Sequence, residues 1–168
     1  MLHITEEHVA AALPMARALE LVEESFRRLD DGRALNHPRR RIRLENGAML
    51  HAMDAGDNVS GLLGAKLYAT RPRVGAHFLV ALFDAETTKP LAVIEADALG
   101  QIRTGAASGV ATKFLAREDA RVLGVIGSGW QAETQLEVCA AARKLEQVKV
   151  FSRKPEKREA FAAKMADK

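Results

Sequence analysis

The sequence RVLGVI at residues 121–126 runs directly into GSGWQA at residues 127–132. The apolar run is typical of a parallel strand buried on both faces, and the two glycines predict a tight turn before a helix at 133–143. In this order, backbone N–H groups and the helix dipole face a bound pyrophosphate. The segment therefore predicts a dinucleotide site, formed by Gly127, Ser128, Gly129, Trp130 and Gln131.

A second apolar run, at residues 148–151, follows that helix. Together the segments make one βαβ unit, the repeating element of a Rossmann domain. A glycine turn alone is a weak signal, because glycines also serve tight turns for purely steric reasons. The strand, turn, helix and strand in succession favour the cofactor site over that alternative.

The N-terminal part has a different pattern. Thr5 and Pro14 predict the starts of two helices, and Asp31-Gly32 ends the second. Strands are expected at 41–44, 48–53, 62–70, 78–83 and 91–95, with Asn46-Gly47 as a hairpin turn. A helix rich in small residues is expected at 104–116. The predicted fold class is α/β: an α+β domain over residues 1–118, then the first half of a Rossmann domain over residues 119–168.

Composition is that of a soluble globular protein: 48% of the 168 residues are hydrophobic, 28% are charged, and the net charge is +3. The arginines at 39–43 alternate along an expected strand without interleaved aromatic residues, so we expect no nucleic-acid partner. We also expect no membrane partner, because no apolar stretch is long enough to span a bilayer. The single cysteine, Cys139, fits a reducing cytoplasm, and neither His51 nor His77 has the spacing of a metal ligand.

Two cations stand in unusual places. Lys66 lies within the apolar strand at 62–68, where a desolvated ammonium is costly without a partner. Its alternative is an edge-strand lysine that points to solvent. Arg103 directly precedes the expected helix at 104–116, where its charge would add to the positive end of the helix dipole and favour an oxyanion. Its alternative is a surface arginine.

Three segments together resemble the ornithine cyclodeaminase and mu-crystallin family: QIRTGAAS at 101–108, ATKFLA at 111–116 and VIGSGWQA at 125–132. The arginine–threonine segment followed at this distance by the glycine turn is more specific than the turn alone. PRR at 38–40 and AKL at 65–67 extend the resemblance to essentially the whole chain.

The resemblance implies a homodimer whose N-terminal domain binds the substrate and forms the subunit interface, while a Rossmann domain holds NAD(H) or NADP(H). It implies hydride transfer at the α-carbon of an amino acid or its cyclic imine, as deaminating cyclisation or as imine reduction. It places Arg40, Met53, Lys66 and Arg103 at the substrate, and Arg103 and Thr104 at the cofactor. The arginines would clamp the carboxylate, and Lys66 would bind it or move protons at the α-nitrogen as the catalytic residue. Which amino acid or imine reacts stays open.

The chain departs from the family pattern where it stops, since residues 155–168 begin or complete a helix and nothing follows. A Rossmann domain needs further strands, and the family's acid/base aspartate lies downstream. We therefore expect the 168 residues alone to be inactive. Two non-catalytic hypotheses stay open: a protein that binds NADP(H) or a small ligand, and an inactive fragment.

The residues after the second strand predict which dinucleotide is preferred. NAD-specific sites carry an acidic residue about 20 positions beyond the glycine turn. This chain instead has Ser152, Arg153 and Lys154, which can hold a 2′-phosphate through charge-assisted hydrogen bonds. The alternative is that both cations are simply solvated. We expect NADP(H) to be favoured over NAD(H).

Overall fold

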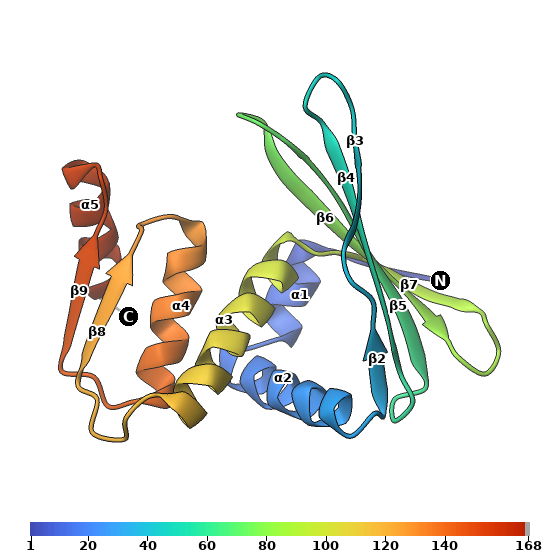
Figure 1. The fold of residues 1–168 in the computed structure, drawn as a ribbon, viewed down its shortest axis with the longest axis horizontal. Coiled ribbons are helices and arrows are strands. Elements are labelled where there is room, and N and C mark those ends of the chain that lie inside the picture. Colours follow the sequence, from blue (N-terminus) through green and yellow to red (C-terminus); the bar gives the residue numbers. More distant parts are fainter. Residues whose placement is uncertain (167–168) are drawn as a thin grey trace. The chain divides into compact units, whose positions relative to one another are not determined.

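A computed structural model describes residues 1–166 of the chain (Figure 1). The fold divides into two compact units, the first comprising residues 1–13 and 24–100, and the second comprising residues 14–23 and those from Gln101 onward. The expected domains, 1–118 and 119–168, stay a prediction. Of the helix expected at 155–168, the last two positions lie outside the described residues.

The first unit is built on a mixed sheet with the strand order β1-β7-β6-β5-β4-β2, and β3 also pairs with β4 (Figure 1). β1 runs parallel to β7, and all other neighbours are antiparallel. The strands are β1 (Leu2–Ile4), β2 (Ala34–Asn36), β3 (Arg40–Arg43), β4 (Met49–Asp57), β5 (Leu62–Arg71), β6 (Gly75–Asp84) and β7 (Pro90–Glu95).

The predicted hairpin between β3 and β4 is confirmed. Gly47 has a φ of 81°, a conformation that favours glycine, and the Asn46 side chain accepts a hydrogen bond from the Ala48 N–H at 2.9 Å. The sequence pattern does not predict β1 or β2, because each has only three residues and so shows no alternation.

The two faces of this sheet differ. One face carries the buried residues His51, Tyr68 and Ala92. Helix α1 (Glu6–Ala12) packs beside β7, and Arg28 of α2 (Met15–Asp30) bonds to Asp57 on this face. By strand alternation the opposite face presents a row of exposed apolar side chains, Leu35, Ile42, Leu50, Leu63, Leu67, Leu79 and Phe83, which we call the apolar sheet face.

The second unit contains the predicted βαβ element. β8 (Val122–Ile126) and β9 (Gln147–Phe151) are parallel, and α4 (Trp130–Ala142) connects them. Helix α5 (Pro155–Ala166) follows β9.

Helix α3 (Asp97–Leu115) begins seven residues before the expected start at 104. The prediction that Arg103 lies at a helix N-terminus is therefore wrong: it sits in the second turn and is exposed. The sequence gives no local signal for the start of α3, because the N–H groups of its first turn donate to Glu6, which is far away in the chain.

Small residues bring α3 against α4. A Cβ atom added at Gly105 would lie 2.8 Å from the Thr134 Cβ, and one at Gly109 would lie 2.1 Å from the Val138 Cγ2. Both distances are shorter than van der Waals contact. Two glycines of α3, four positions apart, therefore contact two residues of α4 that are also four positions apart. The small residues predicted for this helix allow the two helix backbones to approach closely.

Candidate functional site

The turn between β8 and α4 contains two glycines whose backbone conformations differ. Gly127 has a φ of 115°, which only glycine adopts readily, and its N–H donates to the Phe151 carbonyl at 2.7 Å. Gly129 is the N-cap of α4, with an ordinary φ of −91° and no side-chain hydrogen bond to the helix. Apart from the glycine itself and its two chain neighbours, no atom of residues 1–166 lies within 4 Å of a Cβ added at Gly127 or Gly129.

These observations separate the two interpretations of the glycine turn. Backbone conformation explains a glycine at position 127 but not at 129, where any residue could adopt the φ and has room for its side chain. A helix N-cap usually carries Ser, Thr, Asp or Asn. Glycine at 129 instead leaves the first N–H groups of α4 without a side-chain partner and open to a ligand.

The cations expected at the 2′-phosphate lie beside this turn. Ser152, Arg153 and Lys154 line a cavity of about 760 Å³ together with Gly127. Arg153 and Lys154 are exposed and Ser152 is half-buried. The turn after β9 and Gly127 therefore line the same cavity within the second unit.

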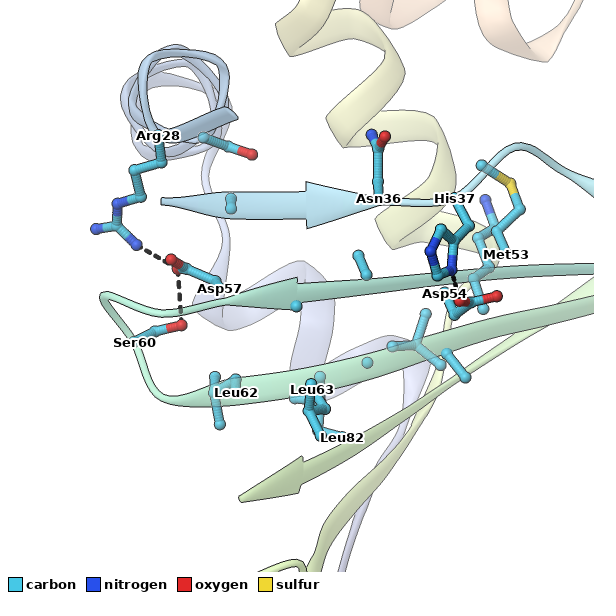
Figure 2. Close-up of a pocket in the computed structure, with 18 residues that line it drawn as sticks. Arg28, Asn36, His37, Met53, Asp54, Asp57, Ser60, Leu62, Leu63 and Leu82 are labelled. Atoms are coloured by element: carbon cyan, nitrogen blue, oxygen red, sulfur yellow. Dashed lines mark hydrogen bonds and ion pairs between the residues drawn. The ribbon is translucent and has the colours of Figure 1, made fainter. Parts of the chain in front are cut away.

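Two of the predicted substrate residues meet in the first unit. Met53 on β4 and Lys66 on β5 are direct cross-strand partners, and both line a cavity of about 420 Å³. Figure 2 shows that Arg28, Asp57 and Ser60 are bonded at one end of this cavity. Met53 lies with His37 and Asp54 at the other end (Figure 2).

Lys66 lies on an interior strand, because β5 is paired with both β4 and β6. The edge-strand alternative is therefore wrong. The side chain is half-buried, with its Nζ 4.6 Å from the ring centre of Phe78 and 5.5 Å from that of Tyr68. Aromatic faces attract an ammonium at such distances, so the two rings offset part of the cost of taking Lys66 out of water.

The structure does not bring Arg40 to the face of Lys66. Arg40 pairs with Ala52 on β4, and strand alternation directs both to the opposite side of the sheet from Met53 and Lys66. The exposed guanidinium donates to Asp54 at 2.6 Å. The pKa of Asp54 lies below its usual value, chiefly because His37 bonds to the carboxylate and also because of the charge of Arg40. The substrate role of Arg40 stays a prediction.

Arg103 and Thr104 belong to the second unit, on α3. Their roles at substrate and cofactor, and the expectation that Arg103 shares a pocket with Lys66, also stay predictions. Near them the Gln101 side chain donates to the Trp130 carbonyl at 2.5 Å. This bond ties α3 to the first residue of α4.

A stack of aromatic rings next to Lys66 was missed by sequence reasoning. His51 lies on Tyr68 with ring centres 4.2 Å apart and an interplanar angle of 2°, and Tyr68 lies on Phe78 at 4.6 Å. Arg39 adds a cation 5.6 Å from the Tyr68 ring centre. The sequence signal for this stack is the alternation of side chains along each strand. It shows that the three rings are neighbours only when the register of β4, β5 and β6 is known.

The His51 pKa is lowered, first by burial and then by the charges of Arg41 and Arg39. Arg41 Nε donates to His51 Nδ1 at 3.3 Å, so the neutral ring carries its proton on Nε2, which lies 3.0 Å from Thr70 Oγ1.

Residues 1–166 hold no group of three or more His, Cys, Asp or Glu side chains arranged to bind a metal ion. Within that same range, every helix is too short or too polar to cross a bilayer.

Comparison with known proteins agrees with the sequence motifs and the geometry. The sequence profile of the ornithine cyclodeaminase/mu-crystallin family matches residues 2–168. The chain belongs to this family. The resemblance inferred from the sequence is thereby confirmed. Alanine dehydrogenase of Archaeoglobus fulgidus is 36% identical over 152 residues, which is 88% of this chain and 47% of that protein.

Two solved structures of family members share the fold. Δ1-pyrroline-2-carboxylate reductase of Thermococcus litoralis, in complex with NADH and L-proline, has a TM-score of 0.93 and 32% identity, covering 99% of this chain and 54% of that one. An archaeal alanine dehydrogenase dimer with bound NAD has a TM-score of 0.93 and 33% identity, covering 99% and 53%. The predicted α/β fold class is confirmed. The chain spans about half the length of these family members.

Proposed function

We propose that this chain is the substrate-binding and first dinucleotide-binding part of an enzyme that transfers hydride between a nicotinamide dinucleotide and the α-carbon of an amino acid or its cyclic imine. The observation that carries the proposal is Gly129. It leaves the α4 N-terminus uncapped and open at the end of β8, where neither packing nor backbone conformation requires a glycine. The family members that bind NADH or NAD support the same cofactor class.

Trp130 provides the test of dinucleotide binding. It is the single tryptophan of the chain, it is the first residue of α4, and it is 49% exposed. NADH or NADPH bound at the glycine turn should change its emission, with calorimetry as an independent measure of binding. Gly129→Ala should weaken binding at least tenfold while the unfolding temperature stays unchanged, because the fold has space for the methyl group. Unchanged affinity in that variant would refute the proposal, as would failure of the unmodified chain to bind either dinucleotide.

Hydride transfer depends on Lys66, which we assign to the substrate. Lys66 lines the same cavity as Met53, and its ammonium group can bind a carboxylate or exchange a proton at the α-nitrogen. The assay uses the product of the whole reading frame, with NADPH oxidation by a cyclic imine as the readout. Lys66→Ala should abolish turnover, and Lys89→Ala, which removes an exposed loop lysine, should not. Dinucleotide binding without any turnover would favour the non-catalytic hypothesis.

We propose NADP(H) as the preferred cofactor, supported by the cavity that Ser152, Arg153 and Lys154 share with Gly127. Arg153→Ala should weaken NADPH binding about tenfold to a hundredfold, as expected for one lost hydrogen bond to a charged group, and should leave NADH almost unchanged. Tighter binding of NADH than NADPH by the unmodified protein would contradict the assignment.

We further propose that the protein is a homodimer that pairs through the apolar sheet face. A row of exposed Leu, Ile and Phe side chains across five neighbouring strands is unusual for a surface that stays in water. An archaeal alanine dehydrogenase of the family is a dimer. Leu67→Glu, at the centre of this face, should yield monomers in analytical ultracentrifugation, and an unchanged mass would argue against this face. A cytoplasmic location stays our prediction.

A further inference from the structure

The cavity beside the glycine turn has one basic wall. Its lining includes Gly127 and Ser152 together with three cations, Arg153, Lys154 and Lys157, and no acidic residue of the described part of the chain lines it. Lys157 lies in the first turn of α5, and its N–H bonds to the Lys154 carbonyl at 3.2 Å. Lys154 directly precedes α5, and both side chains line the same cavity, so Lys154 and Lys157 form a pair of like charges there.

None of these three cations has a hydrogen-bonded or ion-paired side chain as partner within residues 1–166. Other lysines of the second unit do have one, since Lys164 bonds to Glu133 and Lys113 to Glu23, both at 2.7 Å. Like charges that converge without a carboxylate repel one another, and an anion bound between them removes that cost. A phosphate monoester is the anion with the greatest gain, because it carries close to two charges and three acceptor oxygens.

We propose that Lys157 is the third cation of the site for the 2′-phosphate of NADP(H), and that it determines cofactor specificity together with Arg153 and Lys154. This inference rests on the proposed dinucleotide function. Arg153 and Lys154 lie in the loop after β9, whereas Lys157 projects from a helix, so its charge is held at the cavity with less loss of chain entropy on binding. NAD(H) has a neutral hydroxyl at this position and gains little from Lys157.

The test measures binding of NADPH, NADH, 2′,5′-ADP and 5′-AMP to the 168-residue chain by calorimetry. Lys157→Gln should weaken NADPH and 2′,5′-ADP about tenfold and leave NADH and 5′-AMP within about twofold. Lys149→Gln is the matched control, because Lys149 is an exposed lysine on β9 that does not line the cavity. It should change none of the four affinities by more than about twofold.

Each other outcome is decisive. Equal weakening of NADH and NADPH by Lys157→Gln would place the lysine at a part of the cofactor common to both and overturn the inference. Equal behaviour of the Lys157 and Lys149 variants, or no binding of 2′,5′-ADP to the unmodified chain, would also overturn it. If NADH and 5′-AMP bind while the 2′-phosphate adds nothing, the dinucleotide function stands and only the specificity assignment falls. If none of the four binds, the dinucleotide function falls as well.

Discussion

Glu6, near the start of the chain, caps the N-terminus of α3 through a hydrogen bond from the Asp97 N–H. One carboxylate oxygen accepts the Asp97 N–H at 2.7 Å, and the other accepts the Ala98 N–H at 2.7 Å. The backbone of Glu6 in turn donates to the Glu95 side chain at 3.1 Å. A negative charge at this end of a helix is favourable both as a hydrogen-bond acceptor and through the helix dipole. The first helix of the chain is thus fastened to the start of the third.

We expect Glu6→Ala to lower the free energy of unfolding by about 1–2 kcal/mol, the usual cost of losing an N-terminal cap. Chemical denaturation measures the change. Glu7→Ala is the control, because Glu7 is the next residue in the same helix and is exposed. Equal effects of the two substitutions would show that the contact with α3 contributes nothing.

Gly109→Ala should destabilise the fold despite the higher helix propensity of alanine. The added Cβ would lie 2.1 Å from Val138 Cγ2 and 2.9 Å from Leu19 Cδ1, so the helices must move apart. Overpacking of this kind costs about 1–3 kcal/mol, against about 1 kcal/mol gained from propensity. The double variant Gly109→Ala/Val138→Ala should recover part of the loss. No recovery would mean that Val138 is not what resists the methyl group.

His51 should titrate below the ordinary histidine value of about 6.5, because burial and the charge of Arg41 both disfavour its protonated form. NMR of the ring protons gives the midpoint directly. Arg41→Gln should raise the midpoint, and Arg43→Gln should not, since Arg43 is not among the causes of the shift. A group with a lowered pKa in the folded state contributes stability above its unfolded pKa. This contribution should be lost as the pH falls from about 7 through the midpoint of His51.

Asp57 should make the fold sensitive to acid. Its pKa is lowered chiefly by the Ser60 hydroxyl, then by the Val59 N–H and by Arg28. The stability from these bonds is present above the unfolded pKa of about 4 and is lost as the pH falls through the folded value. Asp57→Asn should therefore make the free energy of unfolding fall less steeply between about pH 5 and about pH 2. Denaturation curves at a series of pH values measure this slope. Asp30→Asn, at an exposed position, should leave the slope unchanged.

Local chemistry explains why some elements could be predicted from sequence. The β8 strand, the glycine turn and the parallel partner β9 each depend on adjacent residues, and so does the hairpin at Asn46-Gly47. Each segment was predicted because its own signal lies within about ten residues, and the parallel pairing of β8 with β9 followed from the helix between them.

Other features depend on contacts between distant segments, and the sequence alone predicts them wrongly or leaves them open. The start of α3 depends on Glu6, 91 residues away from Asp97, so no local pattern marks it. The interior position of Lys66 and the direction of Arg40 both depend on strand register, which a single sequence does not reveal.

The close contact of Gly105 and Gly109 with α4 has a consequence for anyone who recombines proteins of this fold. A chimera that exchanges the cofactor-binding segment at the loop near residue 118 would separate α3 from the helix whose surface it was shaped to fit. A junction placed before Asp97, in the short link after β7, would transplant both helices as one piece and would also carry the Gln101 bond to Trp130. The acceptor would then need a carboxylate at the position of Glu6 to cap the new helix, and residues on its own second helix that fit against Gly109 and Lys113 as Leu19 and Glu23 do.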